Sequence, residues 1–534
     1  AKSFIMLRIT ISALLFFSIV TANGQVSNQE ASKKLSTFFR YVQLAYVDTV
    51  NGEELAEDAI RAILKDLDPH SVYISKKDLK KMNEPLEGNF EGIGIQFNIL
   101  HDTIVVVSPI SGGPSEKLGI RAGDKIIEIN DETVAGVGFT NKDVTDNLRG
   151  KKGTQVEVGI KRSGEDQLLD YTITRDKIPI YSVDAAYMAD PETGYLKLNR
   201  FSATSMGEIT TALDSLSKLG MENLILDLRG NAGGYLKTAV DLSDYFLSKG
   251  KLMVYTEGRS YPREDYISTS AGNYEKGKLI ILIDEGTASA SEIVSGAVQD
   301  WDRGLIMGRR SFGKGLVQKP FSLGDGSAIR LTVSRYYTPS GRSIQRPYDE
   351  GGKAYYEEIY NRLNNGELTD SDSIDLPDSL MFKTLESKRT VYGGGGIMPD
   401  IFVPLDTTEF SDLYSLILRK GLLNTYSLDF LDVHRISMQQ DYPTFEDFDK
   451  KFNIEGERLE DFKAYLKKEN IEINETEFTT SQNLITTYLK ALIARSLWGS
   501  TEFYRVSNPI NKTYREALKT MHSDSFKAEG LKSD

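Results

Sequence analysis

The sequence predicts an α/β protein: a mixed, largely parallel sheet with helices, an inserted β-rich domain, and helical N- and C-terminal regions. Three patterns predict this fold class. Strand-like and helix-like segments alternate over residues 176–405, a period of two dominates residues 89–175, and both ends of the chain have a helical pattern. The boundaries that we expect are 1–22, 28–88, 89–175, 176–405 and 406–534.

The composition is that of an ordinary globular chain. Its 534 residues are 40% hydrophobic and 26% charged, which is enough for three or four domains. The net charge of −13 argues against nucleic acid as a general partner. There is no cysteine, and the four histidines are scattered, so we expect no disulfide, no thiol catalysis and no metal site.

The N-terminus has the pattern of a secretory signal. Lys2 and Arg8 precede the apolar run 9–20, and residues 20–22 (VTA) are small where a signal peptidase would cut. The run of twelve residues is too short for a bilayer, which needs about 20. We therefore expect residues 1–22 to be removed and the mature protein to be exported to the periplasm or cell envelope, without stable membrane insertion. A retained signal anchor is the alternative.

Residues 28–88 predict a small helical domain. Its apolar residues recur at three- and four-residue spacing, first at Leu35, Phe38, Phe39, Val42 and Ala45 and then at Leu55, Ala59, Ile60 and Ile63. The period changes to two in residues 89–175. There GIGIQFNIL and TIVVVSPI alternate as strands do, and AGDKI supplies a glycine and aspartate turn.

Residues 176–405 alternate strands with helices. We expect strands at Tyr195–Phe201, Asn223–Leu228 and Leu279–Ile283, and an amphipathic helix that ends at Gly220. This rhythm predicts a largely parallel sheet, and reacting groups gather at the carboxyl ends of the strands in such sheets. Two glycine- and serine-rich loops, DLRGNAGG (227–234) and DEGTASAS (284–291), follow predicted strands.

The remaining segments are less regular. Residues 348–378 are rich in Asp, Glu, Asn and Gly and predict an exposed excursion, after which residues 392–404 return to the core as a strand. From Phe410 onward the chain is helical and charged, as a solvated face is.

The most informative chemistry is a serine-rich turn followed by a glycine-flanked lysine. Ser289 lies in GTASASEI, and Lys314 lies 25 residues later in SFGKGLVQ. A lysine that burial keeps neutral can take the proton of a serine hydroxyl, and no histidine lies in this segment to do so. The alternative is that Ser289 only caps a helix through a capping box with Glu292. The N-terminus of that helix would also favour an oxyanion.

Two further alternatives stay open at this point. Residues 308–314 fit the GxxxxGK half of a phosphate-binding loop, but Gly315 replaces the required Ser or Thr, and LVQKPF predicts a strand where that loop needs a helix. Nucleotide binding is therefore disfavoured. Gly233 and Gly234 either bring backbone N–H groups to a substrate or form a tight strand-to-helix turn.

Five motifs, in this order, resemble those of the carboxyl-terminal processing proteases, also called tail-specific proteases: GIGIQF, PSEKLGIRAGDKI, DLRGNAGG, GTASASEIVSGAVQD and SFGKGLVQ. The similarity covers about residues 60–404. It implies a serine endopeptidase with a Ser/Lys dyad, no cofactor, and one PDZ domain inserted ahead of the catalytic core. Such an enzyme recognises protein C-termini through the PDZ domain and cleaves near them through an acyl-enzyme.

The resemblance also implies individual roles. Ser289 matches the nucleophile, Lys314 the general base, and Gln318 the residue that orients the lysine. The oxyanion donors are expected to be the backbone N–H groups of Ala290 and Gly233.

The GIGI segment matches the loop in which a PDZ domain receives a free carboxylate. Backbone N–H groups around Gly92, Ile93, Gly94 and Ile95 can form an anion nest, while the peptide adds as a strand. Arg149 could reach the same carboxylate, or be plain surface. The expected partners are unfolded or flexible protein C-termini.

No motif of the family continues beyond about Phe410, which leaves two roles open for residues 406–534: homo-oligomerisation or docking of an adaptor. The alternative function is a non-catalytic PDZ scaffold on a degenerate protease core. The simultaneous presence of Ser289, Lys314 and Gln318 argues against it, because a decayed core should have lost at least one of them.

Overall fold

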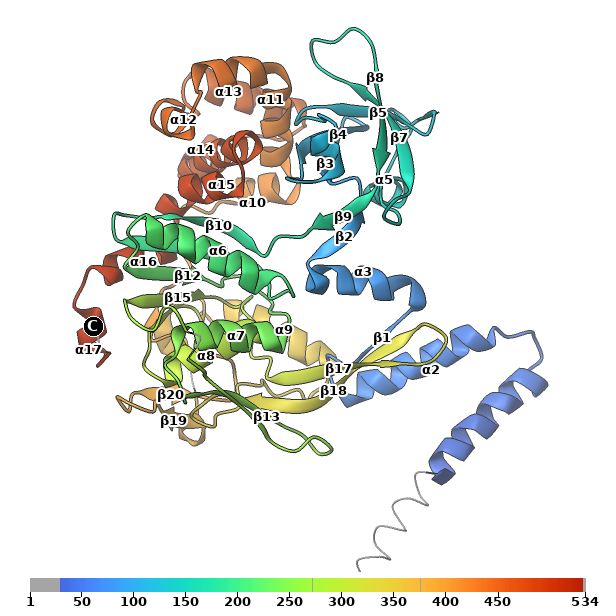
Figure 1. Ribbon diagram of the computed structural model, residues 1–534, viewed down its shortest axis with the longest axis vertical. Coiled ribbons are helices and arrows are strands. Elements are labelled where there is room, and N and C mark those ends of the chain that lie inside the picture. The colour runs from blue at the N-terminus through green and yellow to red at the C-terminus, as the bar shows by residue number, and fades with distance from the viewer. Residues whose placement is uncertain (1–28, 271, 375, 532–534) are drawn as a thin grey trace, which may run out of the picture. The chain divides into compact units, whose positions relative to one another are not determined.

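The computed structural model describes residues 29–270, 272–374 and 376–531 (Figure 1). It divides into two units, Ala1–Tyr73 and Ile74–Asp534. The expected signal segment, residues 1–22, lies outside the described residues. Across the described ranges, no helix is both long and apolar enough to span a bilayer.

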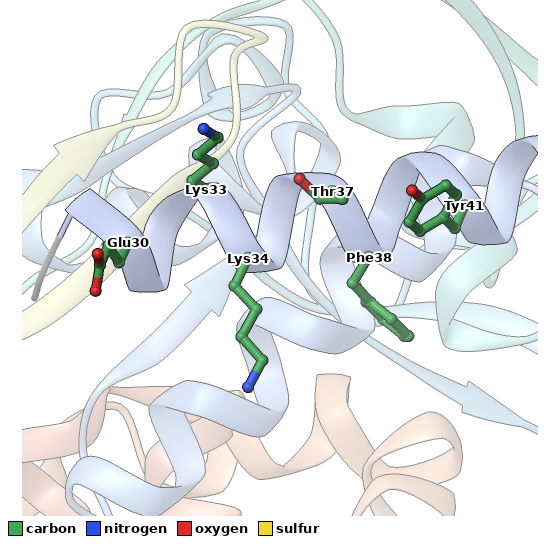
Figure 2. A pocket seen from close by; sticks show the side chains of 6 residues that line it. All are labelled: Glu30, Lys33, Lys34, Thr37, Phe38 and Tyr41. Atoms are coloured by element: carbon green, nitrogen blue, oxygen red, sulfur yellow. The ribbon is translucent and has the colours of Figure 1, made fainter.

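The described part of the first unit is helical, and several apolar residues of its first helix are exposed. Residues 29–45 form one helix, followed by α2 (Gly52–Leu67) and β1 (Val72–Ile74). Asn51 caps α2 by accepting hydrogen bonds from Glu53 N–H and Glu54 N–H. On the first helix Leu35 is 50% exposed and Phe38 60%, so helical periodicity here does not mark a buried face. A hollow on this helix is lined by its own residues (Figure 2), and none of the predicted site residues is among them.

The second unit begins with α3 (Lys76–Glu87), followed by the inserted β-rich domain. β2 (Asn89–Gly92) and β9 (Asp176–Pro179) pair antiparallel where the chain enters and leaves this domain. Its antiparallel sheet has the order β3-β4-β5-β7-β8, so β3 is an edge strand. The elements are β3 (Ile95–Leu100), β4 (Thr103–Pro109), α4 (Pro114–Lys117), β5 (Lys125–Ile129), β6 (Glu132–Thr133), α5 (Asn141–Leu148), β7 (Gln155–Lys161) and β8 (Leu169–Thr174).

The sheet of the central core has the order β10-β11-β12-β15-β16-β21. Only the edge pair β10–β11 is antiparallel, and the other pairs are parallel, which confirms the mixed, largely parallel sheet. The strands are β10 (Val183–Met188), β11 (Thr193–Leu198), β12 (Asn223–Asp227), β15 (Leu279–Ile283), β16 (Leu305–Gly308) and β21 (Ile401–Phe402). β21 confirms the predicted return of residues 392–404 to the core.

Alternate residues of the buried strands face two different layers. On one face, Leu226 and Ile281 pack with residues of α6 (Ser205–Lys218), α7 (Leu236–Phe246) and α8 (Ala290–Asp300). On the other face, Ile225 and Ile280 pack with residues of α16 (Lys512–Met521) and α17 (Ser525–Ala528). Because both faces are covered, the central strands β12 and β15 carry consecutive apolar residues, which made them easy to predict.

A second antiparallel sheet was only partly predicted from the sequence. It contains the hairpin of β17 (Leu316–Ser322) and β18 (Ala328–Tyr337), and β18 also pairs with β13 (Leu252–Glu257), which pairs with β14 (Glu264–Ile267). β17 confirms the strand expected at LVQKPF. Lys314 is thus followed by a strand and not by the helix that a phosphate-binding loop requires.

The prediction of an exposed excursion at residues 348–378 holds only in part, because most of the described residues there are exposed but some are buried. The segment contains the helix α9 (Gly352–Asn364), on which Tyr355 is 3% exposed and Arg362 is 2% exposed. Arg362 is buried because its guanidinium donates to Glu358 and to the backbone oxygen of Ser311. Short elements follow: η1 (Ser371–Ser373), η2 (Asp378–Leu380), β19 (Met381–Lys383) and β20 (Thr390–Tyr392).

The C-terminal region is helical, as predicted, and has its own apolar core. Aromatic side chains such as Phe448, Phe462 and Phe478 are buried in it. Its helices before α16 are α10 (Asp412–Arg419), α11 (Leu422–Asp441), α12 (Phe445–Lys451), α13 (Glu457–Lys468), α14 (Glu475–Leu497), α15 (Ser500–Ser507) and η3 (Asn508–Ile510).

Candidate active site

Three neighbouring parallel strands deliver the predicted site residues. The loop after β12 carries Gly233, the loop after β15 carries Ser289, and the loop after β16 carries Lys314. Because parallel strands end at the same edge of a sheet, residues far apart in the sequence meet there. All five predicted catalytic and oxyanion residues line one groove of about 700 Å³: Gly233, Ser289, Ala290, Lys314 and Gln318.

Hydrogen bonds join the three loops to one another. Gly230 N–H donates to Asp284 Oδ1 over 2.8 Å, and Ala288 N–H donates to Asn231 O over 3.0 Å, which ties the first loop to the second. Phe312 N–H donates to Thr287 O over 2.9 Å, which ties the second loop to the third. The edge of the sheet therefore presents one connected structure, not three independent turns.

Ser289 has a strained backbone. Its φ of 55° and ψ of −113° lie in a region that residues other than glycine rarely adopt, at a cost of about 1–3 kcal/mol. It immediately precedes α8, is partly exposed, and lines the groove. Backbone strain of this kind clusters at functional sites, where surrounding contacts hold it in place.

The two neighbouring hydroxyls have structural roles. Ser291 is fully buried, and its Oγ donates to Asn231 O over 2.9 Å. Thr287 is also buried, and its Oγ1 donates to Leu228 O over 2.9 Å. Ser289 is therefore the one hydroxyl of the TASAS segment that lines the groove.

Lys314 and Gln318 contact each other at the start of β17. Lys314 Nζ donates to Gln318 Oε1 over 3.1 Å, and both side chains line the same groove as Ser289. A side-chain amide oxygen at this place fixes the direction of the ammonium or amine group. This contact is compatible with the orienting role that the family resemblance implies for Gln318.

The two expected oxyanion donors, the N–H groups of Ala290 and Gly233, differ in their hydrogen bonding. Ala290 is the first residue of α8, so its N–H is one of the donors that a helix leaves without an intrahelical acceptor. Gly233 N–H donates to Asn231 Oδ1 over 2.9 Å. Gly233 has a φ of 95°, and a Cβ there would lie 2.8 Å from Ala290 N and 2.9 Å from Ser289 Cβ, so only glycine fits.

Two buried side chains at the groove, of which Tyr336 lines it, were not assigned a site role from the sequence. Glu292 is fully buried, and Tyr336 is 1% exposed. Burial raises the pKa of the Glu292 carboxyl, while hydrogen bonds from Ser311 and from backbone N–H groups act in the opposite direction. Burial also raises the pKa of Tyr336 well above its usual value, so its hydroxyl remains a donor. From the sequence, Glu292 was recognisable only as part of a helix cap, and no sequence pattern indicated a site role for Tyr336.

A second groove lies on the inserted domain, between the edge strand β3 and α5. Ile93, Gly94 and Ile95 line it, whereas Gly92 pairs with Asp176 in β2–β9 beside it. Arg149 also lines this groove. Its guanidinium lies over the ring of Phe90 and forms an ion pair with Glu84 of α3.

Within the described residues, no three His, Cys, Asp or Glu side chains group as a metal site requires. The fold and the groove define a class of protein: a largely parallel α/β core with a serine and a lysine in one groove at the carboxyl ends of neighbouring strands, and a β-rich module inserted ahead of it.

Comparisons with known proteins identify this class. The peptidase family S41 model matches residues 192–350, the PDZ domain model matches residues 92–173, and a family of unknown function, DUF8443, matches residues 413–499. The Carboxy-terminal-processing protease of Bartonella bacilliformis is 38% identical over 339 residues, 62% of this chain and 77% of that protein. The Carboxy-terminal processing protease CtpA of Bacillus subtilis is 34% identical over 343 residues, 63% of this chain and 72% of that protein.

A solved structure to which the chain is similar is the PDZ domain of a carboxy-terminal protease from Vibrio cholerae in complex with a peptide. It is 32% identical and covers 17% of this chain and 97% of that chain, with a TM-score of 0.16. The chain belongs to the carboxy-terminal processing protease family and is a serine peptidase with a PDZ domain. The family expected from the sequence is thus confirmed.

Proposed function

We propose that this peptidase works through a dyad of Ser289 and Lys314. Lys314 Nζ, when unprotonated, takes the proton of Ser289 Oγ, which attacks the scissile carbonyl and forms an acyl-enzyme. The proton passes from Lys314 to the leaving amine. Lys314 then takes a proton from water, which attacks the acyl-enzyme, and the proton returns to Ser289 Oγ as the acyl group leaves. Gln318 orients Lys314 throughout. The observation that carries the proposal is the meeting of these residues in one groove.

The oxyanion of each tetrahedral intermediate is assigned to the N–H groups of Ala290 and Gly233. Both residues line the groove beside Ser289, and α8 begins there, so its N-terminal partial charge favours a negative oxygen. For Gly233 this role requires the N–H to leave Asn231 Oδ1 when substrate binds.

Incubation of the purified full chain with an unfolded protein tests this function against the scaffold alternative. We expect cleavage by the wild type and none by Ser289→Ala. A wild type that binds the unfolded protein without cleaving it would support the scaffold.

Substrate selection is assigned to the groove of the PDZ domain. PDZ domains bind peptides by adding a strand to a sheet edge, and β3 is such an edge. Ile93, Gly94 and Ile95 line the groove, and the cation of Arg149 lies beside them. A free C-terminal carboxylate would accept hydrogen bonds from this backbone and interact favourably with Arg149.

A substrate with a free C-terminus should therefore be cleaved more efficiently than the same substrate with an amidated C-terminus. We expect a difference in kcat/KM of about fivefold, because hydrogen bonds to charged groups are about 1 kcal/mol stronger than neutral ones. Arg149→Gln should reduce this preference. Lys142→Gln is the matched control, because Lys142 lies on α5 in an exposed pair with Asp146, outside the groove. Equal cleavage of both substrates by the wild type would rule out carboxylate recognition.

We also propose export, with loss of the first ~22 residues. The support is the Lys2 and Arg8 flank, the short apolar run and the VTA site. N-terminal sequencing of the mature protein should therefore begin close to residue 23. An intact N-terminus on protein that pellets with membranes would support the anchor alternative instead.

A further inference from the structure

The two proposed catalytic residues lie on separate loops, so something must fix their separation. Glu292 Oε2 accepts a hydrogen bond from Ser289 N–H over 2.7 Å and another from Lys314 N–H over 2.9 Å. One buried oxygen atom thus binds the backbones of both residues. The other oxygen, Oε1, accepts from Gly313 N–H over 2.6 Å and from Ser311 Oγ over 2.5 Å.

Tyr336 makes the complementary contacts from β18. Its hydroxyl donates to Lys314 O over 2.7 Å and to Ser289 O over 3.1 Å. Glu292 therefore binds the backbone N–H groups of Ser289 and Lys314, and Tyr336 binds their backbone carbonyl groups. We call Glu292 and Tyr336 the backbone clamp.

We infer that the backbone clamp positions Ser289 and Lys314 for proton transfer. This inference rests on the proposed Ser/Lys function. Neither clamp residue is assigned contact with the reacting atoms, so each acts as a positioning residue through the catalytic backbones. A misplacement of reacting groups by about 1 Å can reduce turnover 100-fold, which gives such a clamp its effect.

The chemistry of the contacts requires these particular side chains. All four partners of the Glu292 carboxylate are donors, and the Ser311 hydroxyl also accepts from Ile397 N–H, so its own proton is committed to Glu292. Glu292→Gln would place an NH2 group, which is itself a donor, against two of these donors, so those two hydrogen bonds would be lost. Phenylalanine at position 336 would keep the ring packing but remove the O–H that both carbonyls share.

The clamp residues belong to a helix and a strand, and not to the loops that they bind. Glu292 lies in the first turn of α8, and Tyr336 lies near the end of β18, which pairs with both β17 and β13. A site supported from helices and strands keeps its geometry better than one supported from loops. The clamp also holds Ser289 in its strained backbone conformation.

Pre-steady-state kinetics separate positioning from folding. With a peptide p-nitrophenyl ester, the burst amplitude counts folded, active molecules, whereas the burst rate constant reports acylation by each of them. For Glu292→Gln and Tyr336→Phe of the full chain, we expect the rate constant to fall about 100-fold with the amplitude preserved. KM for an unfolded protein should change little.

Two control variants remove hydrogen-bonding groups of the same kind at residues that touch neither catalytic residue. Asp400 has a 4% exposed side chain and accepts from Ile306 N–H, Gln299 and Arg389, so Asp400→Asn also replaces a buried carboxylate by an amide, as Glu292→Gln does. Tyr274 O–H donates to Glu222 O over 2.8 Å, so Tyr274→Phe matches Tyr336→Phe. Both controls should keep the wild-type burst rate constant, whatever they do to the melting temperature.

If Glu292→Gln does not fold, Tyr336→Phe carries the test alone. Burst rate constants equal to the wild type in the clamp variants, with only the amplitude reduced, would overturn the clamp and leave a structural role. A burst that persists in Ser289→Ala would instead overturn the proposed dyad, so the two failures are distinguishable.

Discussion

Ser289→Ala is expected to abolish peptide-bond cleavage, whereas Ser291→Ala should yield a folded enzyme with substantial activity. Removing the nucleophile of a serine peptidase typically costs a factor of about 10⁴ or more in kcat. Ser291, by contrast, is buried, and its hydroxyl donates a hydrogen bond to Asn231 O. Losing this bond should lower the free energy of unfolding by about 1 kcal/mol. Cleavage of an unfolded protein, with circular dichroism of each variant, measures both effects.

Ser291→Ala is the matched control for Ser289→Ala. The two residues are two positions apart, and each variant loses a single hydroxyl. If Ser291 proved essential and Ser289 dispensable, the assigned register of the TASASE segment would be wrong.

Lys314→Arg should be nearly inactive, with a loss of about 10² to 10⁴ in kcat, the usual contribution of a general base. A guanidinium keeps the charge but does not give up its proton at any pH that the enzyme tolerates. Because only unprotonated Lys314 can accept the proton of Ser289, kcat/KM of the wild type should rise from neutral to alkaline pH. A pH–rate profile checks this rise.

Near wild-type turnover of Lys314→Arg would remove the lysine from the mechanism. Lys353→Arg is a suitable control, because Lys353 is exposed on α9, pairs with Glu357 and does not line the groove. It should retain full activity and the wild-type pH profile.

The sequence predicted the parts of the fold whose burial leaves a one-dimensional pattern. β12 and β15 are covered on both faces, so β15 (LIILI) is wholly apolar and β12 (NLILD) has an apolar centre, and each is followed by a glycine- or serine-rich loop. That pattern was enough to place Gly233 and Ser289 at the same edge of a sheet. The motif match then supplied Lys314 and Gln318.

Other features depend on partners that no local pattern reveals. Residues 348–378 look solvated, yet Arg362 is buried because Glu358 and the oxygen of Ser311 receive its guanidinium. The helix of residues 29–45 has an apolar face that stays exposed. Periodicity identifies a helix, but it does not supply the surface that would cover it.

The backbone clamp shows the same limit at the site. Glu292 reads as a helix cap from its spacing to Ser289, but its bonds to residues 311–314 exist only because β16 returns the chain beside α8. Tyr336 and Tyr337 are indistinguishable in the sequence. Strand pairing decides that Tyr336 faces the site while Tyr337 stacks on Tyr255 with ring centroids 4.8 Å apart.

The central claim is that Ser289 carries the acyl group during turnover. Acid quenching of the reaction with a peptide p-nitrophenyl ester, followed by peptide mapping and mass spectrometry, tests it most directly. We predict a mass increase equal to the acyl group on the peptide that contains Ser289, lost in Ser289→Ala and retained in Ser291→Ala. An acyl group on Ser291, or on a residue outside the groove, would contradict the account.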